Sequence, residues 1–481
     1  MPKNFTLLHN SINLEGDKVK IAVVGNGSLG MYAAIEAKLN FKDADITVFG
    51  PPERPLAAST AAGAMVNVYA EMEHSEGLLL QANERYLEMG KIGTSLWRKF
   101  LNDTNGPECV TSEDTYIYLQ ESASSFEKSN YEAVMKYAEN DGVLEVLSKK
   151  AISECFPSHA NNKIESAIRI KGEFSFSTLN LFRHLDQYAS KIGIHFNGSK
   201  VLNVDLQSLN LEIENETLKF DRIIMTTGVH TKRLLKYSSM LPLFQGVGVA
   251  VLINPINDIE NKKLRRGVFR SVNRGGAQCG IHLVPREDGK FYLGAGNYVS
   301  KVQEPVIRLD TIRYLLSTLE NDLIGRECAY ELTGEFKLGL RPRSLDGFPM
   351  IGALRSNPKI FVATGTNRAG LTWAPFVATE IVNWLKDIPT SKLIADWEPE
   401  RDPIPYGSES EGINYFRQSR LSNSMEHGLL SRDADERQVG LKLDEFTKTA
   451  QLLASQVSNK LGLPSGATVN PDNWAAILSE I

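Results

Sequence analysis

The sequence has few cysteines and no long apolar segment. Its four cysteines, Cys109, Cys155, Cys279 and Cys328, lie far apart and form no CxxC pair. This spacing argues against a zinc site and a disulfide framework, and it fits a reducing compartment. The longest apolar runs, such as 247–253, are strand-sized and far shorter than the roughly 20 residues that cross a bilayer.

A charge imbalance and a secretion signal are also missing. Basic residues number 53 and acidic residues 58, so the net charge of -5 gives no reason to expect a nucleic-acid partner. The first twenty residues hold no apolar stretch of about 7–15 residues, which a signal peptide requires. We therefore expect a cytoplasmic protein with no metal site and no nucleic-acid or membrane partner.

The length allows more than one hydrophobic core. A single core stops growing at about 250–300 residues, whereas this chain has 481 residues, of which 42% are hydrophobic. Two lobes and an appendage are the natural expectation.

An apolar strand and a glycine-rich turn form the first informative pattern. Residues 18–24 (KVKIAVV) are predicted to be a buried strand, which the turn 25–30 (GNGSLG) joins to a helix over 31–40. A second strand over 45–49 (DITVF) lies at a distance that suits a right-handed crossover, so the unit predicts a parallel sheet. In this context the glycines indicate a dinucleotide site, because they let a pyrophosphate approach the helix N-terminus.

One residue expected at such a site is absent. An acidic side chain about 20 residues after the glycine turn ordinarily binds the adenosine ribose, but here the second strand ends in Gly50. Either Glu53 reaches back to the ribose, or backbone and water contacts replace the acidic side chain.

The rest of the chain predicts a second lobe and a C-terminal extension. Helices are predicted, from apolar residues every three or four positions, at 73–102, 131–155, 177–192 and 376–385. Short apolar or alternating runs predict strands at 115–119, 194–196, 221–228, 246–252, 280–284, 291–295 and 361–364. The alternation in 246–295 suggests an antiparallel sheet, with a hairpin turn at 286–289.

Beyond Trp397 the composition becomes polar and charged. Residues 398–412 (EPERDPIPYGSESEG) predict an extended linker, which a C-terminal helix follows. Its apolar stripe is buried either against the same chain, as a strap, or against a protein partner or second copy. The stripe consists of Leu443, Phe446, Ala450, Leu453, Val457 and Leu461.

A segment of small residues favours FAD over NAD. Residues 57–65 (AASTAAGAM) let the backbone lie against a flat cofactor, and Ser59 and Thr60 can donate hydrogen bonds to phosphate oxygens. The same segment also suits a helix start packed tightly beneath a strand.

Two later blocks complete a resemblance to a known family. Residues 339–352 (GLRPRSLDGFPMIG) and 363–370 (ATGTNRAG) follow the earlier blocks in an order that resembles the glycine oxidase, sarcosine oxidase and D-amino-acid oxidase superfamily of FAD-dependent oxidoreductases. Residues 221–228 (DRIIMTTG), followed by 241–246 (LPLFQG), are similar to the family's middle section. The resemblance runs from about 18 to 385 and does not cover the remaining residues.

The resemblance implies roles for three residues. Arg341 matches the arginine that binds the substrate carboxylate in glycine-oxidase-like members, and Arg368 matches a second arginine near the flavin. A guanidinium suits a carboxylate because it donates two parallel charge-assisted hydrogen bonds, although both arginines could instead close structural ion pairs. His282 occupies the place of a tyrosine that faces the substrate, where it would bind a carboxylate, change its charge near neutral pH, or be a satisfied core residue.

The cofactor site is predicted from the same blocks. Gly365 and Gly370 would let backbone N–H groups approach the flavin, and no cysteine lies where the family forms a covalent flavin link, so FAD is expected to bind non-covalently. The predicted cofactor-binding residues are Gly25, Gly27, Ser28, Leu29, Gly30, Glu53, Ser59, Thr60, Ala62, Gly63, Met65, Gly228, Gly365, Asn367, Ala369, Gly370 and Leu371.

Together these patterns predict an α/β protein with a Rossmann-like FAD-binding lobe and an α+β substrate lobe built on an antiparallel sheet. The FAD-binding domain would comprise 18–75, 155–240 and 335–395, the substrate domain 76–154 and 241–334, and the C-terminal extension 396–481.

The expected activity is oxidation of a small carboxylate-bearing amine or amino acid by hydride transfer to flavin, giving an imine. A 2-hydroxy-acid dehydrogenase on the same scaffold and a flavoprotein subunit that acts with a partner protein are the alternatives.

Overall fold

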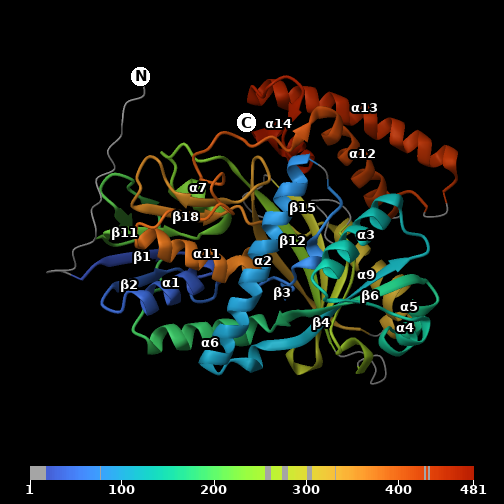
Figure 1. Cartoon of the computed structure of the whole chain (residues 1–481), viewed down its shortest axis with the longest axis horizontal. Helices are drawn as coiled ribbons and strands as arrows, with labels where there is room; N and C mark the ends of the chain where they lie inside the picture. The colour runs from blue at the N-terminus through green and yellow to red at the C-terminus, as the bar shows by residue number, and fades with distance from the viewer. Residues whose placement is uncertain are drawn as a thin grey trace.

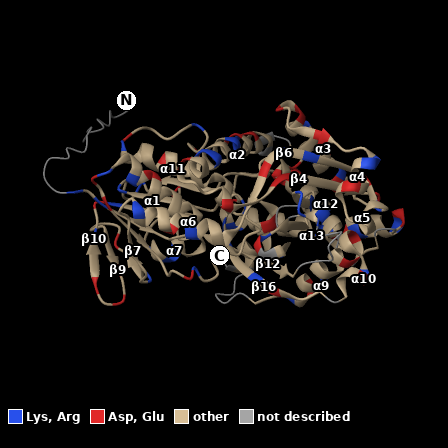
Figure 2. Ribbon diagram, turned by 90° about the horizontal axis from the view of Figure 1, so that it is seen from below, with Lys and Arg blue, Asp and Glu red and all other residues tan. Residues whose placement is uncertain are grey.

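Two β-sheets lie side by side, and a mainly helical C-terminal region lies across them (Figure 1). The structure, a computed structural model, describes residues 18–75, 77–254, 262–273, 280–300, 306–330, 332–426, 429–431 and 434–480. None of the helices in these ranges has the length and apolar composition needed to span a membrane. Acidic and basic residues are intermixed over both halves of the described chain (Figure 2).

The first sheet is mostly parallel and contains the predicted βαβ unit. Its strand order in the described chain is β17-β18-β11-β1-β2-β7, and neighbours run parallel except β17 and β18. The parallel pairing of β1 with β2 confirms the prediction. The strands are β1 (Lys20–Val24), β2 (Asp45–Phe49), β7 (His195–Asn197), β11 (Arg222–Met225), β17 (Met350–Ala353) and β18 (Ile360–Thr364).

Both faces of this sheet are covered, because successive side chains of a strand point to opposite faces. Ile21 and Val23 pack in a core with helices α1 (Ser28–Asn40), α6 (Thr178–Lys191) and α11 (Gly370–Leu385). Ala22 and Val24 pack in the core on the other face. That face is covered by β8 (Asn203–Val204), β9 (Asn210–Glu212), β10 (Thr217–Lys219) and α7 (Thr231–Leu234).

The second sheet is larger and mostly antiparallel, as predicted. Its order in the described chain is β16-β12-β15-β14-β13-β4-β6-β3, with β5 also paired to β6; only β13 and β4 run parallel. The strands are β3 (Met65–Val66), β4 (Val110–Gln120), β5 (Leu144–Val146), β6 (Ile164–Phe176), β12 (Leu243–Ile253), β13 (Val268–Ser271), β14 (His282–Pro285), β15 (Phe291–Ser300) and β16 (Gly334–Ser344).

Helices from several parts of the chain surround the second sheet. The long helix α2 (Gly77–Thr104) runs between the two halves and contacts α11 (Figure 1). The other helices of this half are α3 (Ser125–Asn140), α4 (Lys149–Cys155), α5 (Ser158–Asn161), α9 (Leu309–Thr318), the π-helix η5 (Leu319–Ile324) and α10 (Arg326–Ala329). Their apolar residues close two cores against the sheet.

The C-terminal extension packs on its own chain, as the strap interpretation predicted. Phe244 of β12 and Leu345 after β16 share a core with Phe416, Ala454 and Trp474 of the extension. Its elements are β19 (Gly407–Ser408), α12 (Glu409–Glu426), α13 (Glu436–Leu461), β20 (Ala467–Thr468) and α14 (Trp474–Glu480). A protein partner or second copy at this helix stays a prediction.

Three predicted boundaries differ from the structure. The helix over 131–155 is interrupted by β5, which pairs with β6. The linker over 398–412 is shorter than predicted, because α12 begins at Glu409.

The third difference concerns the two lobes. Strands β3, β6 and β16 lie in the ranges predicted for the FAD-binding domain, and they pair within the larger sheet. Sequence pattern identifies a strand and does not identify its partner in a sheet. The division of the chain into domains stays a prediction.

Candidate active site

The glycine turn after β1 has the geometry that its sequence predicts. Gly25 has a φ of +112°, and its N–H donates to the Phe49 carbonyl at 2.9 Å. A Cβ at Gly25 would lie 2.5 Å from the Thr226 carbonyl oxygen, and one at Gly30 only 1.8 Å from the Gly25 oxygen. Glycine is therefore required at both positions so that α1 can begin directly above the sheet.

The N-terminus of α1 opens into a cavity of about 490 Å³ between the two sheets. Gly27 is the N-cap and offers no side chain, and the Ser28 N–H donates to Ser59 Oγ at 3.1 Å. Leu29 also lines the cavity. A helix N-terminus and nearby hydroxyl groups form a site suited to a pyrophosphate.

Most of the predicted cofactor-binding residues line this single cavity. They come from four distant parts of the chain: Gly25, Gly27, Ser28 and Leu29; Ser59, Ala62, Gly63 and Met65; Gly228; and Asn367, Ala369, Gly370 and Leu371. The glycine-lined walls and the helix N-terminus fit a long, flat dinucleotide such as FAD. None of the described cysteines lines the cavity.

Four of the predicted residues lie elsewhere. Glu53 is exposed and lines, together with Thr60, a separate surface hollow, so neither side chain reaches the cavity. Gly30 serves the helix–strand packing described above. Gly365, with a φ of +71°, lines a second, neighbouring cavity.

The structure explains why position 50 carries no acidic side chain. Gly50 has a φ of +154°, and a Cβ there would lie 2.7 Å from Asn26 Oδ1. Asn26 donates through Nδ2 to the Pro51 carbonyl at 2.8 Å, and Arg54 Nε donates to the Asn26 carbonyl, also at 2.8 Å. Both side chains line the cavity. Asn26 thus occupies the space beside the end of β2.

Sequence reasoning missed several lining residues in addition to Asn26. Arg54 is 8% exposed and is held by an ion pair with Asp186 and by the Phe182 ring, 4.6 Å away. Its place two residues after the GPP turn was a usable signal. The others, Lys200, Val201, His230 and Arg233, follow elements whose approach to the cavity depends on the fold.

Arg341 lines the cavity without an acidic partner in the described part of the chain. Its Nη1 is buried and donates no hydrogen bond there. Space for the guanidinium comes from the facing strand β12, where a Cβ at Gly248 would lie 2.9 Å from Arg341 Cζ. An unpaired buried guanidinium requires an anion, and a carboxylate matches its planar geometry.

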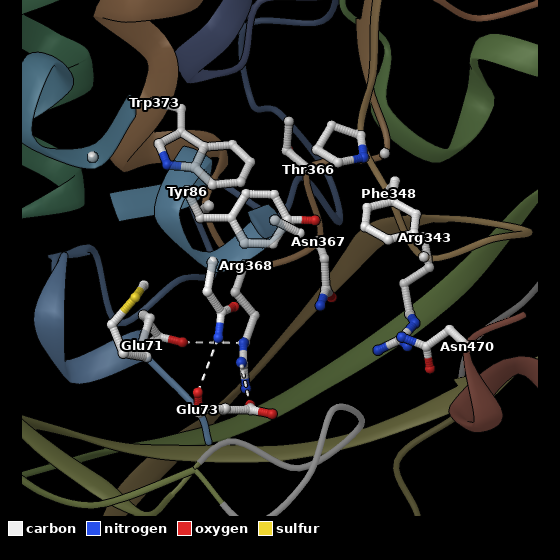
Figure 3. A pocket seen from close by; sticks show the side chains of 18 of the residues that line it. Glu71, Glu73, Tyr86, Arg343, Phe348, Thr366, Asn367, Arg368, Trp373 and Asn470 are labelled. Atoms are coloured by element: carbon white, nitrogen blue, oxygen red, sulfur yellow. Dashed lines mark hydrogen bonds and ion pairs between the residues drawn. The ribbon is translucent and has the colours of Figure 1, made fainter. Parts of the chain in front are cut away.

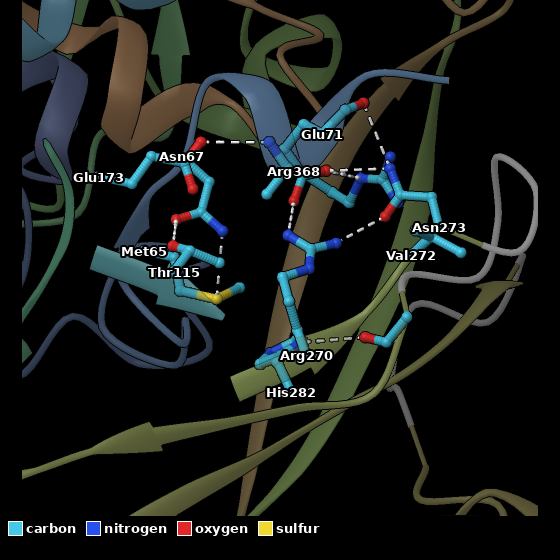
Figure 4. A network of polar contacts seen from close by, with 12 residues as sticks. Met65, Asn67, Glu71, Thr115, Glu173, Arg270, Val272, Asn273, His282 and Arg368 are labelled. Atoms are coloured by element: carbon cyan, nitrogen blue, oxygen red, sulfur yellow. Dashed lines mark hydrogen bonds and ion pairs between the residues drawn. The ribbon is translucent and has the colours of Figure 1, made fainter. Parts of the chain in front are cut away.

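Arg368 also lines the cavity, but it is engaged in ion pairs. Its Nε lies 3.2 Å from Glu71 Oε2, and its Nη2 lies 3.4 Å from Glu73 Oε1. Figure 4 shows Glu71 between Arg368 and Arg270. The Arg270 side chain is fully buried and donates to Glu71 Oε1 at 2.6 Å. The contacts of Arg368 are therefore those of structural ion pairs, one of the two roles considered for this arginine.

Burial and the nearby arginines determine the pKa values of Glu71 and Glu73. Burial acts to raise the pKa of Glu71, but Arg368 and Arg270 together lower it to about 2. Glu73 differs, because burial raises its pKa while Arg368 acts in the opposite direction. Glu71 is accordingly a carboxylate at neutral pH.

His282 lines the cavity as a neutral imidazole. Its Nδ1 lies 3.0 Å from the Gly280 carbonyl, and its ring stacks on Tyr292 with centroids 5.9 Å apart. Burial, followed by the nearby Arg270 charge, lowers its pKa to about 3. Among the possibilities considered for His282, burial thus disfavours a charge change near neutral pH, because the buried cationic form is costly.

A second cavity, of about 170 Å³, is also lined by Arg368 (Figure 3). Both cavities are lined by Asn67, Glu71 and the turn 366–369. The C-terminal extension supplies part of its wall through Tyr406, Tyr415 and Asn470. We call this cavity the second chamber.

Comparison with known proteins agrees with this geometry. Glycine oxidase from Geobacillus kaustophilus has a TM-score of 0.66 and 17% identity, with 79% of this chain and 99% of that chain covered. Iminodiacetate oxidase from Chelativorans sp. BNC1 has a TM-score of 0.64 and 15% identity, covering 79% and 98%. L-α-glycerophosphate oxidase from Mycoplasma pneumoniae, determined with FAD bound, has a TM-score of 0.63 and 16% identity, covering 81% and 100%.

At these identities the solved structures establish the fold. No curated protein matches the sequence. The family model described as FAD dependent oxidoreductase matches residues 20–384, which agrees with the extent of the resemblance and ends before the extension. The chain belongs to this family and is an FAD-dependent oxidoreductase.

Proposed function

We propose that this enzyme oxidises an amine or amino acid that carries a carboxylate. The observation that carries the proposal is Arg341, whose guanidinium lines the FAD cavity without an acidic partner in the described chain. A substrate carboxylate would supply the missing charge and accept two parallel hydrogen bonds. Arg341 would thereby fix the position and orientation of the carbon atom beside the carboxylate.

The surrounding residues suit this reaction. Bound FAD supplies the hydride acceptor. Gly370, Leu371 and Thr372 place the N-terminus of α11 at the cavity, where its partial positive charge favours negative charge on a bound group. The neutral His282 can accept a hydrogen bond from the substrate amine through Nε2, because Nδ1–H donates to the Gly280 carbonyl.

Anaerobic reduction of the flavin tests the proposal. The purified holoenzyme is mixed with amino acids, N-methyl amino acids or 2-hydroxy acids while its visible flavin absorbance is followed. We expect an amine to bleach the flavin, and Arg341→Ala to lower the efficiency at least about 100-fold with FAD still bound, since each charge-assisted hydrogen bond contributes about 1.5–3 kcal/mol. Lys337→Ala is the matched control, because Lys337 lies on the same strand and pairs with exposed Glu335.

Other outcomes contradict the proposal in distinct ways. Bleaching by 2-hydroxy acids alone would replace the amine by a hydroxyl group as the site of oxidation. A holoenzyme that no compound bleaches would favour a subunit that needs a protein partner.

A further inference from the structure

The second chamber has walls of a different chemistry from those of the FAD cavity. Tyr86 and Trp373 contribute aromatic rings whose centroids lie 5.0 Å apart, and Tyr406 and Tyr415 of the extension face the same space. Phe348 lies at its edge (Figure 3). Aromatic faces attract cations and exclude anions.

The positive side chains around the chamber already have partners. Arg343 is 3% exposed, lies 3.6 Å from Asp472 Oδ2 and donates through Nε to Asn473 Oδ1 at 3.2 Å. Arg368 is paired with Glu71 and Glu73. Both guanidinium groups of the chamber therefore already lie beside carboxylates.

The chamber also offers hydrogen-bond acceptors. Glu73 lines it and contacts Arg368 through Oε1 at 3.4 Å. Asn367 Oδ1 is buried and has no hydrogen-bond partner in the described chain. The Tyr86 hydroxyl points toward Asn367 in Figure 3 and makes no hydrogen bond with a described residue. Three acceptors among aromatic rings complement an ammonium or guanidinium group.

We propose that the second chamber is a subsite for a cationic end of the substrate, held by Glu73, Asn367 and Tyr86. This inference rests on the proposed function and narrows it: the carboxylate lies on Arg341, and the substrate extends past Arg368 to a distal ammonium or guanidinium group. The two cavities share the lining residues Asn67, Glu71 and the turn 366–369. The aliphatic chain of such a substrate would pass from one cavity to the other along these residues. Because Tyr406 and Tyr415 belong to the extension, the extension completes the subsite.

Calorimetric binding to the FAD-loaded, full-length protein tests the subsite without turnover. The probes are 4-aminobutanoate, 5-aminopentanoate and 6-aminohexanoate, each compared with the carboxylate that lacks the amino group. These molecules have no amine beside the carboxylate. We expect one chain length to bind roughly 10-fold to 100-fold more tightly than its uncharged counterpart, as a charge-assisted hydrogen bond predicts.

Substitutions then assign the effect to the chamber. Glu73→Gln should reduce the preference for the amino compound to about 2-fold or less without changing the affinity for the plain carboxylate. Tyr86→Phe, which keeps the ring, should reduce it less and guards against loss of folding in the first variant. Glu216→Gln, which changes an exposed carboxylate in the turn between β9 and β10, should have no effect.

The two proposals fail in different ways. Equal binding of amino compounds and plain carboxylates at every chain length, or an unchanged preference in Glu73→Gln, overturns the subsite. Loss of all carboxylate binding in Arg341→Ala, combined with an intact preference in the parent enzyme, supports both proposals. If Arg341→Ala binds every probe as tightly as the parent enzyme does, Arg341 does not bind the carboxylate, and this contradicts the proposed function.

Discussion

Arg341 and Arg368 line the same cavity, yet their surroundings differ. Arg341 lies over Gly248 of β12 and has no acidic partner in the described chain. Arg368 contacts two carboxylates, one of which also neutralises the fully buried Arg270. Both are arginines in motifs of the same family, and in the sequence they invite the same interpretation. The difference teaches that an arginine's role depends on which charges the fold places beside it.

Among the substitutions that test this comparison, Glu71→Gln has the largest expected effect on stability. Glu71→Gln would leave Arg270 buried without its anionic partner, so we expect the free energy of unfolding to fall by about 3–5 kcal/mol. Denaturant unfolding of the FAD-loaded protein measures this. Glu113→Gln, which breaks an exposed pair with Arg98, should cost less than about 1 kcal/mol. Equal losses in both variants would contradict the assigned difference.

Replacing each arginine by methionine compares them directly. Arg368→Met should lower the free energy of unfolding by about 1–3 kcal/mol, because Glu73 loses its ion pair and Glu71 loses one of its two arginine partners. Arg341→Met should change it by less than about 1 kcal/mol, because no internal pair is broken. Enzyme activity should instead fall more in Arg341→Met than in Arg368→Met. If Arg341→Met is the more destabilised variant, Arg341 has a structural role.

The pH dependence of stability tests the neutral state of His282. Its pKa is about 3 in the folded protein and 6.5 ordinarily, so the unfolded chain binds the additional proton between these values. Stability is therefore lost as the pH falls from 6.5 towards 3, by roughly 2 kcal/mol between pH 7 and pH 5. His282→Gln should lack this share of the pH dependence. An identical pH profile in both proteins would mean that His282 titrates normally.

A substitution far from both arginines should have the smallest combined effect on stability and activity. Asp435 caps α13 by accepting a hydrogen bond from the Gln438 N–H at 2.8 Å. Asp435→Ala should lower the free energy of unfolding by about 1 kcal/mol and leave flavin reduction unchanged. A marked loss of activity in this variant would show that the extension influences the site through more than its wall residues.

Local patterns predicted much of the nucleotide-binding half. The turn 25–30 was predictable because a tight turn between a buried strand and a helix leaves room only for glycine, and the structure shows the overlaps that any side chain would cause. The helix over 177–192 was predictable from its apolar period, and the structure shows that Ser177 caps it by accepting a hydrogen bond from the Asn180 N–H.

The electrostatic environments could not be predicted in this way. Glu53 was expected to replace the missing ribose ligand, but it is exposed, while Asn26 and Arg54 lie at the cavity. A charge change near neutral pH was one of three possibilities for His282, and burial beside Arg270 lowers its pKa to about 3. Both properties depend on residues far away in the sequence.

By itself, the sequence determined the strand–turn–helix unit, the family, and the two arginines that could meet an anion. Only the tertiary structure decided which arginine is unpaired, that Glu71 joins Arg368 to Arg270, and that the C-terminal extension closes a second chamber. The physical reason is the distance along the chain over which each feature is determined. Backbone turns and helix periods depend on residues within a few positions, whereas pairing and desolvation depend on groups that only folding brings together.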